Sequence, residues 1–476
     1  MPTDNPLDKP EIALLIASYL QQPDLSACIR VSKAWRDEFL PLLWREIVFN
    51  TETPLLGPHP ASVCRYRHLI YNLTILGDPF EVEGFCYPNL RTLTLLRNDE
   101  SSPRDVFLNI DRMCPSLLNL TFDDVPVAAA IWSTVSTHRH LNSLALYCCE
   151  VTTATAPGFW RVCANLETLT LVSVNIEGGR IPDDVVFNRM RTLEFVSIDW
   201  FGSNPVFDGD AQLDMILRCP NLSKLDWGLP FYMHITHPVR NGYLPHLRDL
   251  RLGGELGDRD LALLLERIKD GPETLARLVL SFCSVEEQAS RLLGLHFDTL
   301  VELDLEKCEL STRSLRRDIL CGCRNLKTLS AGVIPAKDIA EGGPWVCQQL
   351  RKLVIWFRFE ASEKDLQALV FGHLSALVQL EELRMRFPKH EEYDEGDSML
   401  EFRLDCGLGQ LASLQQLKYL KFDPGCVFKP QLEAKDVEWM VENWKNIIGI
   451  FGDLNKVTEE NDRLKLVLRD QGILLS

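Results

Sequence analysis

The stretch Leu300-Val-Glu-Leu303-Asp-Leu305-Glu-Lys-Cys308-Glu-Leu310 decides the fold of this 476-residue chain. Its first leucines are three and then two residues apart, and this six-residue core recurs with leucine at the fourth position each time. Further copies start at Leu90, Leu117, Leu141, Leu166, Met190, Leu222, Leu247, Leu275, Leu326, Leu350, Leu380 and Leu417. Successive starts are mostly about 24 to 28 residues apart, which is the spacing of a structural repeat.

The spacing within each copy predicts how the unit folds. Side chains alternate along a strand, so the fourth and sixth positions point to one face. A single strand cannot bury that face, whereas a stack of units forms one continuous core. Each unit hides about three aliphatic side chains at about 2 kcal/mol apiece, so the array needs neither a cofactor nor a disulfide to fold. The whole pattern, L-x-x-L-x-L-x-x-C-x-L, resembles the leucine-rich repeat, whose period it shares.

The resemblance implies an α/β fold, a curved leucine-rich-repeat solenoid with parallel strands on its concave face. Segments between strands, such as 211–218 and 260–268, have helical spacing and are expected on the convex face. Residues 461–472 are predicted to form a helix that caps the end of the solenoid. The long interval between the units at 380 and 417 contains the acidic stretch 389–397, which we expect to be an exposed loop, either solvated or a contact site.

Charge and hydropathy exclude several classes of partner. The chain has 50 basic and 67 acidic residues and a formal net charge of −17, so nucleic acid is not expected as its main partner. The apolar run 12–20 is too short to span a membrane, and acidic residues replace the basic flank of a signal peptide. We therefore expect no membrane partner and a cytoplasmic and/or nuclear location.

The fifteen cysteines are expected to be buried free thiols. Zinc sites use two close pairs of ligands, but Cys148-Cys149 and the Cys321/Cys323 pair have no second pair at matching distance. No nucleophile, metal or nucleotide motif stands out either. We therefore expect no metal site, no cofactor, no catalytic residue and no enzyme activity.

The first fifty residues follow a different pattern, that of three short helices. Pro10 and Glu11 suit a first helical turn. The apolar stripe that follows consists of Ile12, Leu15, Ile16, Tyr19 and Leu20. Asp24 is predicted to cap a second helix and Ser32 a third, which Pro41 limits. The spacing of Trp44, Ile47 and Phe49 predicts that the solenoid core begins there. So small a helical core needs cover from a partner chain or from the first repeats, and a simple cap for the solenoid is the alternative.

The same residues resemble an F-box. The family pattern runs L-P-x-E-I, Y-L, D-L, C, V-C/S-K-x-W and P-x-L-W. It is matched in order by residues 6 to 48, although two residues separate Leu7 from Pro10. Combined with the repeats, the chain resembles F-box/leucine-rich-repeat proteins, especially the large fungal groups whose F-box begins N-P-L. The implied organisation is an F-box at 1–50, a junction at 51–65 and the solenoid with its capping C-terminus at 66–476.

This resemblance implies the substrate-recognition subunit of an SCF ubiquitin ligase. The F-box would dock on a Skp-type adaptor, which links it to the cullin and RING scaffold, while the repeats hold an unknown protein substrate. The residues expected to contact the adaptor or to form the fold that does are Pro10, Ile12, Leu15, Ile16, Leu20, Leu25, Cys28, Val31 and Trp35. The helical stripe with Leu25 and Val31 is the expected contact, and Trp35 fits contact and core equally. The alternative function is a leucine-rich-repeat scaffold whose F-box-like segment is structural or engages an adaptor without a ligase.

The repeat register also places a candidate substrate surface. If positions four and six face the core, positions three, five and seven line the concave sheet, and those of the later units are charged. The candidate substrate-binding residues are Arg251, Glu302, Asp304, Glu306, Trp356, Arg358, Arg384, Arg386 and Lys421. Trp356 beside arginines has the composition of an interface hot spot. Solubility alone would also explain the charges, and Trp356 would then be tucked into a neighbouring unit.

Overall fold

The computed structural model describes the greater part of the chain in two compact units. Unit 1 comprises Met1–Leu222 with Thr236–Gly242, and unit 2 comprises Ser223–Ile235 with Tyr243–Ser476. The described residues are 9–50, 58–77, 86–96, 110–127, 129–177, 181–196, 209–228, 244–268, 275–310, 314–360, 363–386, 398–423 and 430–475. The acidic stretch 389–397 lies outside them.

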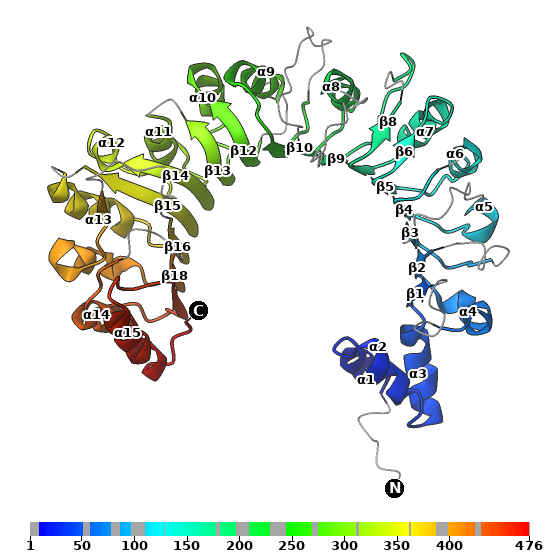
Figure 1. The fold of residues 1–476 in the computed structure, drawn as a ribbon, viewed down its shortest axis with the longest axis horizontal. Coiled ribbons are helices and arrows are strands. Elements are labelled where there is room, and N and C mark those ends of the chain that lie inside the picture. Colours follow the sequence, from blue (N-terminus) through cyan, green and yellow to red (C-terminus); the bar gives the residue numbers. More distant parts are fainter. Residues whose placement is uncertain are drawn as a thin grey trace. The chain divides into compact units, whose positions relative to one another are not determined.

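Three helices open unit 1, as the sequence predicts: α1 (Pro10–Ala17), α2 (Gln22–Cys28) and α3 (Lys33–Leu43). Figure 1 shows them packed together at the N-terminal end of this unit. The Ser32 hydroxyl accepts a hydrogen bond from the Trp35 amide at 3.1 Å, which confirms the predicted cap of α3. The predicted cap of α2 is wrong, because Asp24 lies inside the first turn and its carboxylate accepts the Gln21 amide in a capping box. Pro41 does not limit α3 but lies within it.

The core of the three-helix domain is small. Its buried residues are Ala13, Leu25 and Phe39, at 4%, 7% and 0% exposure. Partly buried side chains pack around them, namely Ala17, Leu20, Cys28, Ile29, Trp35, Leu42 and Leu43. The domain is joined to the next element through Gln22, whose amide donates to the carbonyls of Leu43 and Glu46.

The sheet of unit 1 is built from short parallel strands, one to a repeat. They are β1 (Glu46–Asn50), β2 (Asn72–Leu76), β3 (Thr92–Leu96), β4 (Asn119–Asp123), β5 (Ser143–Tyr147), β7 (Thr168–Val172) and β9 (Thr192–Val196). Each strand pairs with the next in unbroken register, so the leucines at the fourth position are aligned: Leu73, Leu93, Leu120, Leu144, Leu169 and Leu193. β1 pairs with β2, which confirms that the solenoid core begins at Ile47 and Phe49. A second, two-stranded parallel sheet joins β6 (Glu150–Val151) to β8 (Asn175–Ile176).

Unit 2 continues the same construction. Its parallel strands are β10 (Lys224–Gly228), β11 (Asp249–Gly253), β12 (Arg277–Val285), β13 (Glu302–Leu310), β14 (Thr328–Pro335), β15 (Lys352–Phe359), β16 (Glu382–Met385), β18 (Tyr419–Phe422) and β19 (Gly449–Phe451). The expectation that all strands are parallel is wrong at β17 (Ser398–Met399), which pairs antiparallel with the end of β15. β17 comes from the long interval between two repeats, so it is not bound to the repeat's direction.

Burial follows the predicted alternation. In β3, for example, Leu93 and Leu95 are each 2% exposed, whereas Thr92, Thr94 and Leu96 are half-buried. The same pattern holds in β2, β4, β5, β7, β9, β10 and β11. The fourth and sixth positions therefore form the core, and the third, fifth and seventh form the opposite face of the sheet.

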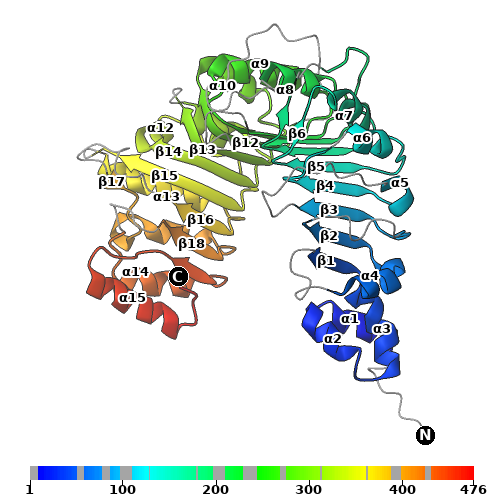
Figure 2. The same cartoon turned by 45° about the vertical axis from the view of Figure 1, so that its right-hand side comes forward.

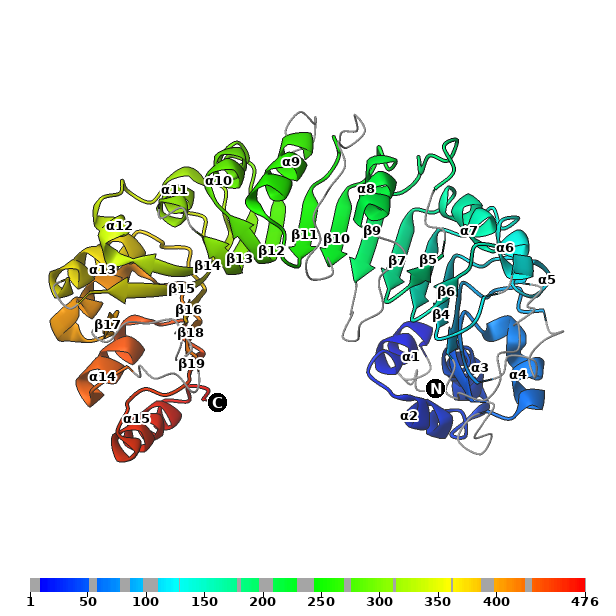
Figure 3. The same cartoon turned by 45° about the horizontal axis from the view of Figure 1, so that its top comes forward.

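Helices and turns cover the core side of each sheet, as Figure 2 shows for unit 1 and Figure 3 for unit 2. In unit 1 they are α4 (Pro60–Tyr66), α5 (Ile110–Met113), α6 (Ala129–Val135), α7 (Ala156–Cys163) and α8 (Gly209–Leu217). In unit 2 they are α9 (Asp258–Ile268), α10 (Glu287–Gly294), α11 (Leu315–Gly322), α12 (Ala336–Ala340), α13 (Gln367–Ser375), α14 (Ala434–Asn443) and α15 (Thr458–Asp470). α8, α9 and α15 confirm the predicted helices. None of the described helices is long and apolar enough to cross a membrane.

The turn after the strand is a regular feature that the sequence pattern does not reveal. The eighth residue of several repeats adopts a left-handed backbone, with φ between 50° and 53° at Asp124, Cys148 and Ser173, directly after their strands, and 62° at Phe282 within β12. Small or polar side chains tolerate this conformation best, whereas Phe282 is a bulky exception and is 53% exposed.

The cysteines of the described residues are free, and many are buried. Burial raises the pKa of the Cys114, Cys323 and Cys347 thiols to about 12, so these groups stay protonated. They pack as small apolar side chains, as the sequence suggests. Among the described residues, no group of three or more His, Cys, Asp or Glu side chains is arranged to hold a metal ion.

A buried histidine predicts how stability depends on pH. His296 is 5% exposed, and burial lowers the pKa of its imidazole below the usual value. Above pH 6.5 the side chain is neutral in both the folded and the unfolded chain, so it adds no pH dependence. As pH falls below 6.5, the unfolded chain takes up a proton that the folded chain resists, so folding free energy is lost. We expect urea unfolding between pH 5 and 8 to show a steeper acid loss for the wild type than for His296→Gln, and equal slopes would contradict this.

Candidate functional site

The three-helix domain exposes apolar side chains that its own core does not use. Leu15, Tyr19 and Val31 are 62%, 82% and 65% exposed, and Leu14 is 51% exposed. Leu14 and Leu15 lie on α1, Tyr19 follows α1, and Val31 follows α2. We call these four residues the apolar face of the domain. Such residues on so small a domain are typical of a surface that a partner covers.

The structure divides the expected adaptor residues into three groups. Leu15 and Val31 are exposed, as a contact requires. The half-buried residues are Ile12, Ile16, Leu20, Cys28 and Trp35. Leu25 is buried in the core, so its expected role in direct contact is wrong in this conformation: the core-facing side of α1 is formed by Ala13 and Ala17, and Leu25 packs against that side. The side chain of Pro10 is outside the described part.

The sequence pattern did not predict two of the exposed residues, Leu14 and Tyr19, as adaptor contacts. Leu14 was outside the predicted stripe, and Tyr19, although in the stripe, was not among the predicted adaptor residues. The buried position of Ala13 explains their exposure. When Ala13 faces the core, the next two residues of α1, Leu14 and Leu15, point away from it. Trp35 packs on Phe39 with ring centroids 5.3 Å apart, which is a core contact.

The second candidate surface is the sheet face of unit 2 opposite the core. Its charged residues pair across neighbouring strands. Arg277 of β12 lies 2.9 Å from Glu302 of β13 and 3.6 Å from Asp249 of β11, whereas Arg251 lies 4.0 Å from Asp249 within β11 itself. These pairs are partly exposed, so each contributes little to stability, but together they fix the side-chain positions.

Further pairs link the later strands. Arg384 lies 2.6 Å from Asp423, and Lys421 lies 2.9 Å from Glu382. Arg386 pairs with Asp423 and also with Glu306, so this arginine joins β16 to β13 across the two strands between them. The Glu306 carboxylate also accepts the Ser330 hydroxyl at 2.8 Å. Burial raises the pKa of the neighbouring Asp304 carboxyl. Arg358 is half-buried at the end of β15.

Trp356 is not the exposed anchor that the sequence suggests. It is 3% exposed, and Val354 on the same face of β15 is 5% exposed. Two features explain this burial. The register between β14 and β15 shifts between Ser330 and Gly332, and the Arg386–Glu306 ion pair reaches across β15. Trp356 is thus tucked among neighbouring units, which was the stated alternative, and it does not form part of an open binding surface.

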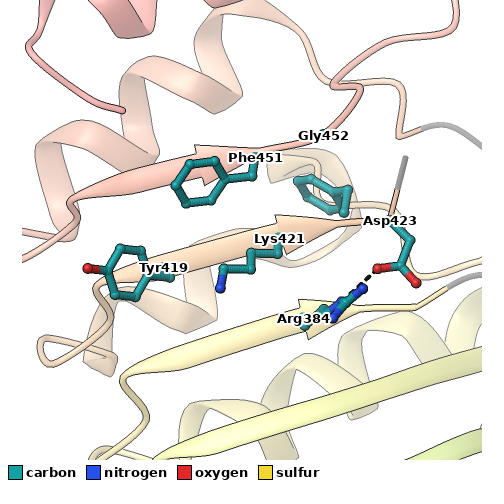
Figure 4. Close-up of a pocket in the computed structure, with 7 residues that line it drawn as sticks. Arg384, Tyr419, Lys421, Asp423, Phe451 and Gly452 are labelled. Atoms are coloured by element: carbon teal, nitrogen blue, oxygen red, sulfur yellow. Dashed lines mark hydrogen bonds and ion pairs between the residues drawn. The ribbon is translucent and has the colours of Figure 1, made fainter. Parts of the chain in front are cut away.

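A pocket of about 620 Å³ lies farther along this face, over β16, β18 and β19. Figure 4 shows its residues: Arg384 from β16, Tyr419, Lys421 and Asp423 from β18 and the residue after it, and Phe451 and Gly452 from β19 and the residue after it. The Lys421 ammonium lies 5.3 Å from the centre of the Tyr419 ring and 5.9 Å from that of Phe451. The two rings stack with centroids 6.2 Å apart.

The repeat register accounts for this pocket only in part. Arg384, Tyr419, Lys421 and Asp423 were expected on this face, but Phe451 was not named. Phe451 pairs in register with Lys421, so it occupies the fifth position of a further, degenerate repeat, in which Ile447 and Ile450 stand at the first and fourth positions. That weak repeat was the signal that could have found it.

Glycines let the last strand approach the pocket closely. A side-chain carbon at Gly449 would lie 2.4 Å from the Phe451 ring, so this glycine gives the ring its place. Gly452 has φ +98°, and a side-chain carbon there would lie 2.1 Å from the carbonyl oxygen of Phe422. The wall of the pocket therefore requires glycine at 452, whereas a side chain at 449 would displace the Phe451 ring.

Gly452→Ala is expected to lower the free energy of unfolding by about 2–3 kcal/mol, because it adds both backbone strain and a clash with main chain. Chemical denaturation monitored by tryptophan fluorescence measures the change. Gly409→Ala is the matched control, because a side-chain carbon there meets no atom within 4 Å. Equal stability of the two variants would show that the backbone at 452 relaxes freely.

Comparison with known proteins identifies the N-terminal helical domain. Residues 10–50 match a family model described as F-box-like. No curated protein matches the sequence. Solved structures similar to the chain include the leucine-rich-repeat ectodomain of the Arabidopsis receptor kinase HAESA in complex with an IDA peptide hormone ligand, with 14% identity over 82% of this chain and 64% of that chain and a TM-score of 0.40. They also include an internalin, InlF, of Listeria monocytogenes, with 14% identity over 79% of this chain and 90% of that one and a TM-score of 0.39.

A third similar structure is the plant peptide hormone receptor RGFR1 in complex with RGF2, with 12% identity over 83% of this chain, 61% of that chain and a TM-score of 0.39. The chain thus spans less than two thirds of the length of the two plant receptors. The N-terminal helices form an F-box-like domain, and the sheet that follows has the register and burial of leucine-rich repeats. In domain composition the chain is an F-box/leucine-rich-repeat protein, and its fold class is the predicted α/β solenoid type. Its assignment to a fungal subgroup stays a prediction.

Proposed function

We propose that the protein is a non-catalytic substrate-recognition subunit of an SCF-type ubiquitin ligase. The observation that supports this most is the apolar face on a domain that matches the F-box-like model. A Skp-type adaptor would cover that face and connect the protein to the cullin and RING scaffold. The sheet face of unit 2 would hold the protein substrate.

This proposal is one of recruitment. Holding a substrate close to a charged ubiquitin-conjugating enzyme raises the effective concentration of the reactants, so no group of this chain needs to take part in chemistry. The proposed organisation remains an F-box at 1–50, a junction at 51–65 and the repeat solenoid at 66–476. We place the protein in the cytoplasm and/or the nucleus, where a ubiquitin ligase works.

Reconstitution tests the proposal. The purified full chain, a Skp-type adaptor and a cullin–RING complex are expected to co-elute in size-exclusion chromatography as one stoichiometric assembly. Failure to bind the adaptor at micromolar concentrations would refute the adaptor role. Binding of the adaptor without recruitment of the cullin would refute the ligase role.

A repeat scaffold with a structural F-box-like cap is the second candidate. It is favoured by the close connection between the helices and the first repeat, where Trp44 packs on Tyr66 at 4.7 Å and β1 pairs with β2. The two candidates differ in the apolar face, because a cap has no use for exposed Leu15, Tyr19 and Val31. In the scaffold case, aspartate at these positions would change no interaction of the protein.

A further inference from the structure

We propose that the pocket over β16, β18 and β19 binds a partner peptide through one carboxylate side chain and an adjacent apolar side chain. This inference rests on the proposal that the sheet face of unit 2 holds the substrate. It does not depend on adaptor binding. It names the chemistry of the substrate segment, which the domain composition alone leaves open.

The cations of the pocket have donors to spare. Arg384 uses its Nε–H towards Asp423, at 2.6 Å, and its two terminal Nη groups make no hydrogen bond within the described part of the chain. Lys421 donates one hydrogen bond, to Glu382 at 2.9 Å. The two acidic residues therefore hold the cations in place without using up their donors. The planar end of Arg384 suits a carboxylate, which it can bind through two parallel hydrogen bonds.

The charge balance favours a single carboxylate over other ligands. The Lys421 ammonium already lies near the Tyr419 and Phe451 rings, so it would repel a second, incoming cation there. Arg384 is paired with Asp423 and Lys421 with Glu382, so the pocket has little excess positive charge with which to balance a dianion such as a phosphate group. A carboxylate can accept the unused N–H groups of Arg384 and Lys421 while it adds only one negative charge to the pocket.

The aromatic wall supplies the second half of the site. The rings of Tyr419 and Phe451 stack on each other at the pocket wall. The pocket volume of about 620 Å³ is in the range that holds a compact ligand. An apolar or aromatic side chain next to the carboxylate would pack on these rings. Phe451 is on a strand paired in register with that of Lys421, and its ring stacks on that of Tyr419, so the wall is formed before the ligand arrives, which reduces the entropy that binding loses.

A selection from a phage-displayed library of random heptapeptides tests the proposal on the full-length protein. The enriched peptides are expected to share an Asp or Glu next to an apolar or aromatic residue. Synthesised singly, such a peptide is expected to bind at least tenfold more tightly than its Gln or Asn counterpart, and more tightly than a version with phosphoserine at the acidic position. Fluorescence anisotropy measures these affinities.

Variants of the protein then locate the binding. Arg384→Met with Lys421→Met is expected to weaken the acidic peptide at least tenfold, and Phe451→Ala is expected to weaken it by reducing the apolar contact. Arg324→Met with Arg463→Met removes the same charge from side chains that are 72% and 69% exposed and lie outside the pocket, and it is expected to bind as the wild type does. Thermal unfolding of each variant excludes loss of fold.

Three results would overturn the proposal: no enriched peptide, enriched peptides without an acidic residue, or equal binding by the pocket variant and its control. Tighter binding of the phosphoserine peptide would overturn the assignment of a carboxylate. The adaptor assay is independent of this selection. Adaptor binding without peptide selection would therefore contradict only the pocket proposal. Peptide selection without adaptor binding would contradict only the ligase role.

Discussion

Leu15→Asp with Val31→Asp is expected to weaken binding of a Skp-type adaptor by about 100-fold while the repeat solenoid stays folded. Both side chains are more than 60% exposed, so the folded domain accepts aspartate there. In a complex, each aspartate would place an unpaired charge in an apolar interface. We expect each of them to lower the affinity for the adaptor about tenfold. Isothermal titration calorimetry with the purified adaptor measures the loss.

The controls separate contact from folding. Val457→Asp with Leu466→Asp makes the same change at side chains of 54% and 55% exposure in the last repeat region, and it is expected to leave adaptor binding unchanged. Leu25→Asp is not a valid contact variant, because Leu25 is in the core and its charge would unfold the helices. Adaptor binding that survives the Leu15 and Val31 double variant would remove the support for the receptor role and favour a structural cap.

Periodicity explains why the repeat fold could be predicted. A leucine stands at the fourth position of thirteen repeats, because each repeat must bury that side chain in the core. So many copies keep the pattern visible even where single positions deviate from it. The structure confirms the consequence down to the register, where Leu225 pairs with Leu250 and Leu278 with Leu303. The direction of β17 could not be foreseen, because it comes from a segment that occurs only once.

The F-box-like domain shows the opposite case. Its family resemblance identified the segment, but a helical stripe does not say which of two neighbouring faces packs inward. Ala13 at 4% exposure and Leu15 at 62% exposure show that a small residue occupies the core position. Of the stripe that was expected to contact the adaptor, Leu15 and Tyr19 are exposed, whereas Ile12, Ile16 and Leu20 are half-buried. This is a matter of tertiary packing against Leu25 and Phe39, which no local pattern contains.

The sequence predicts which charged residues lie on the sheet face of unit 2. Whether such a residue can bind a partner depends on which of them form ion pairs with each other. Glu306 and Arg386 are eighty residues apart, and only the fold shows that they join over β15 and that Trp356 is buried. The same network leaves the Nη groups of Arg384 unpaired within the described residues. Sequence position identified the face, and the distances between side chains identified the pocket.

Asp436→Ala is expected to cost about 4 kcal/mol of unfolding free energy, the largest loss that we predict for one polar side chain. Asp436 lies in the first turn of α14 and is 0% exposed. Its carboxylate accepts the amide of Glu433 at 2.9 Å and the amide of Leu404, from the preceding interval between repeats, also at 2.9 Å. Alanine would take the acceptor from both partly buried N–H groups and from the buried end of α14, at about 1–3 kcal/mol for each lost hydrogen bond.

The graded variant and the local readout make this prediction specific. Asp436→Asn keeps one carbonyl acceptor and is expected to lose about half as much stability, whereas Glu438→Ala on the exposed side of α14 should change little. Hydrogen exchange should accelerate first at the amides of Leu404 and Glu433. Since Asp436 joins the interval after β16 to the helix that precedes β19, its loss should also loosen the wall of the pocket and weaken the acidic peptide. Uniform acceleration of exchange across unit 2, with no lead at these two amides, would show that Asp436 acts only through global stability.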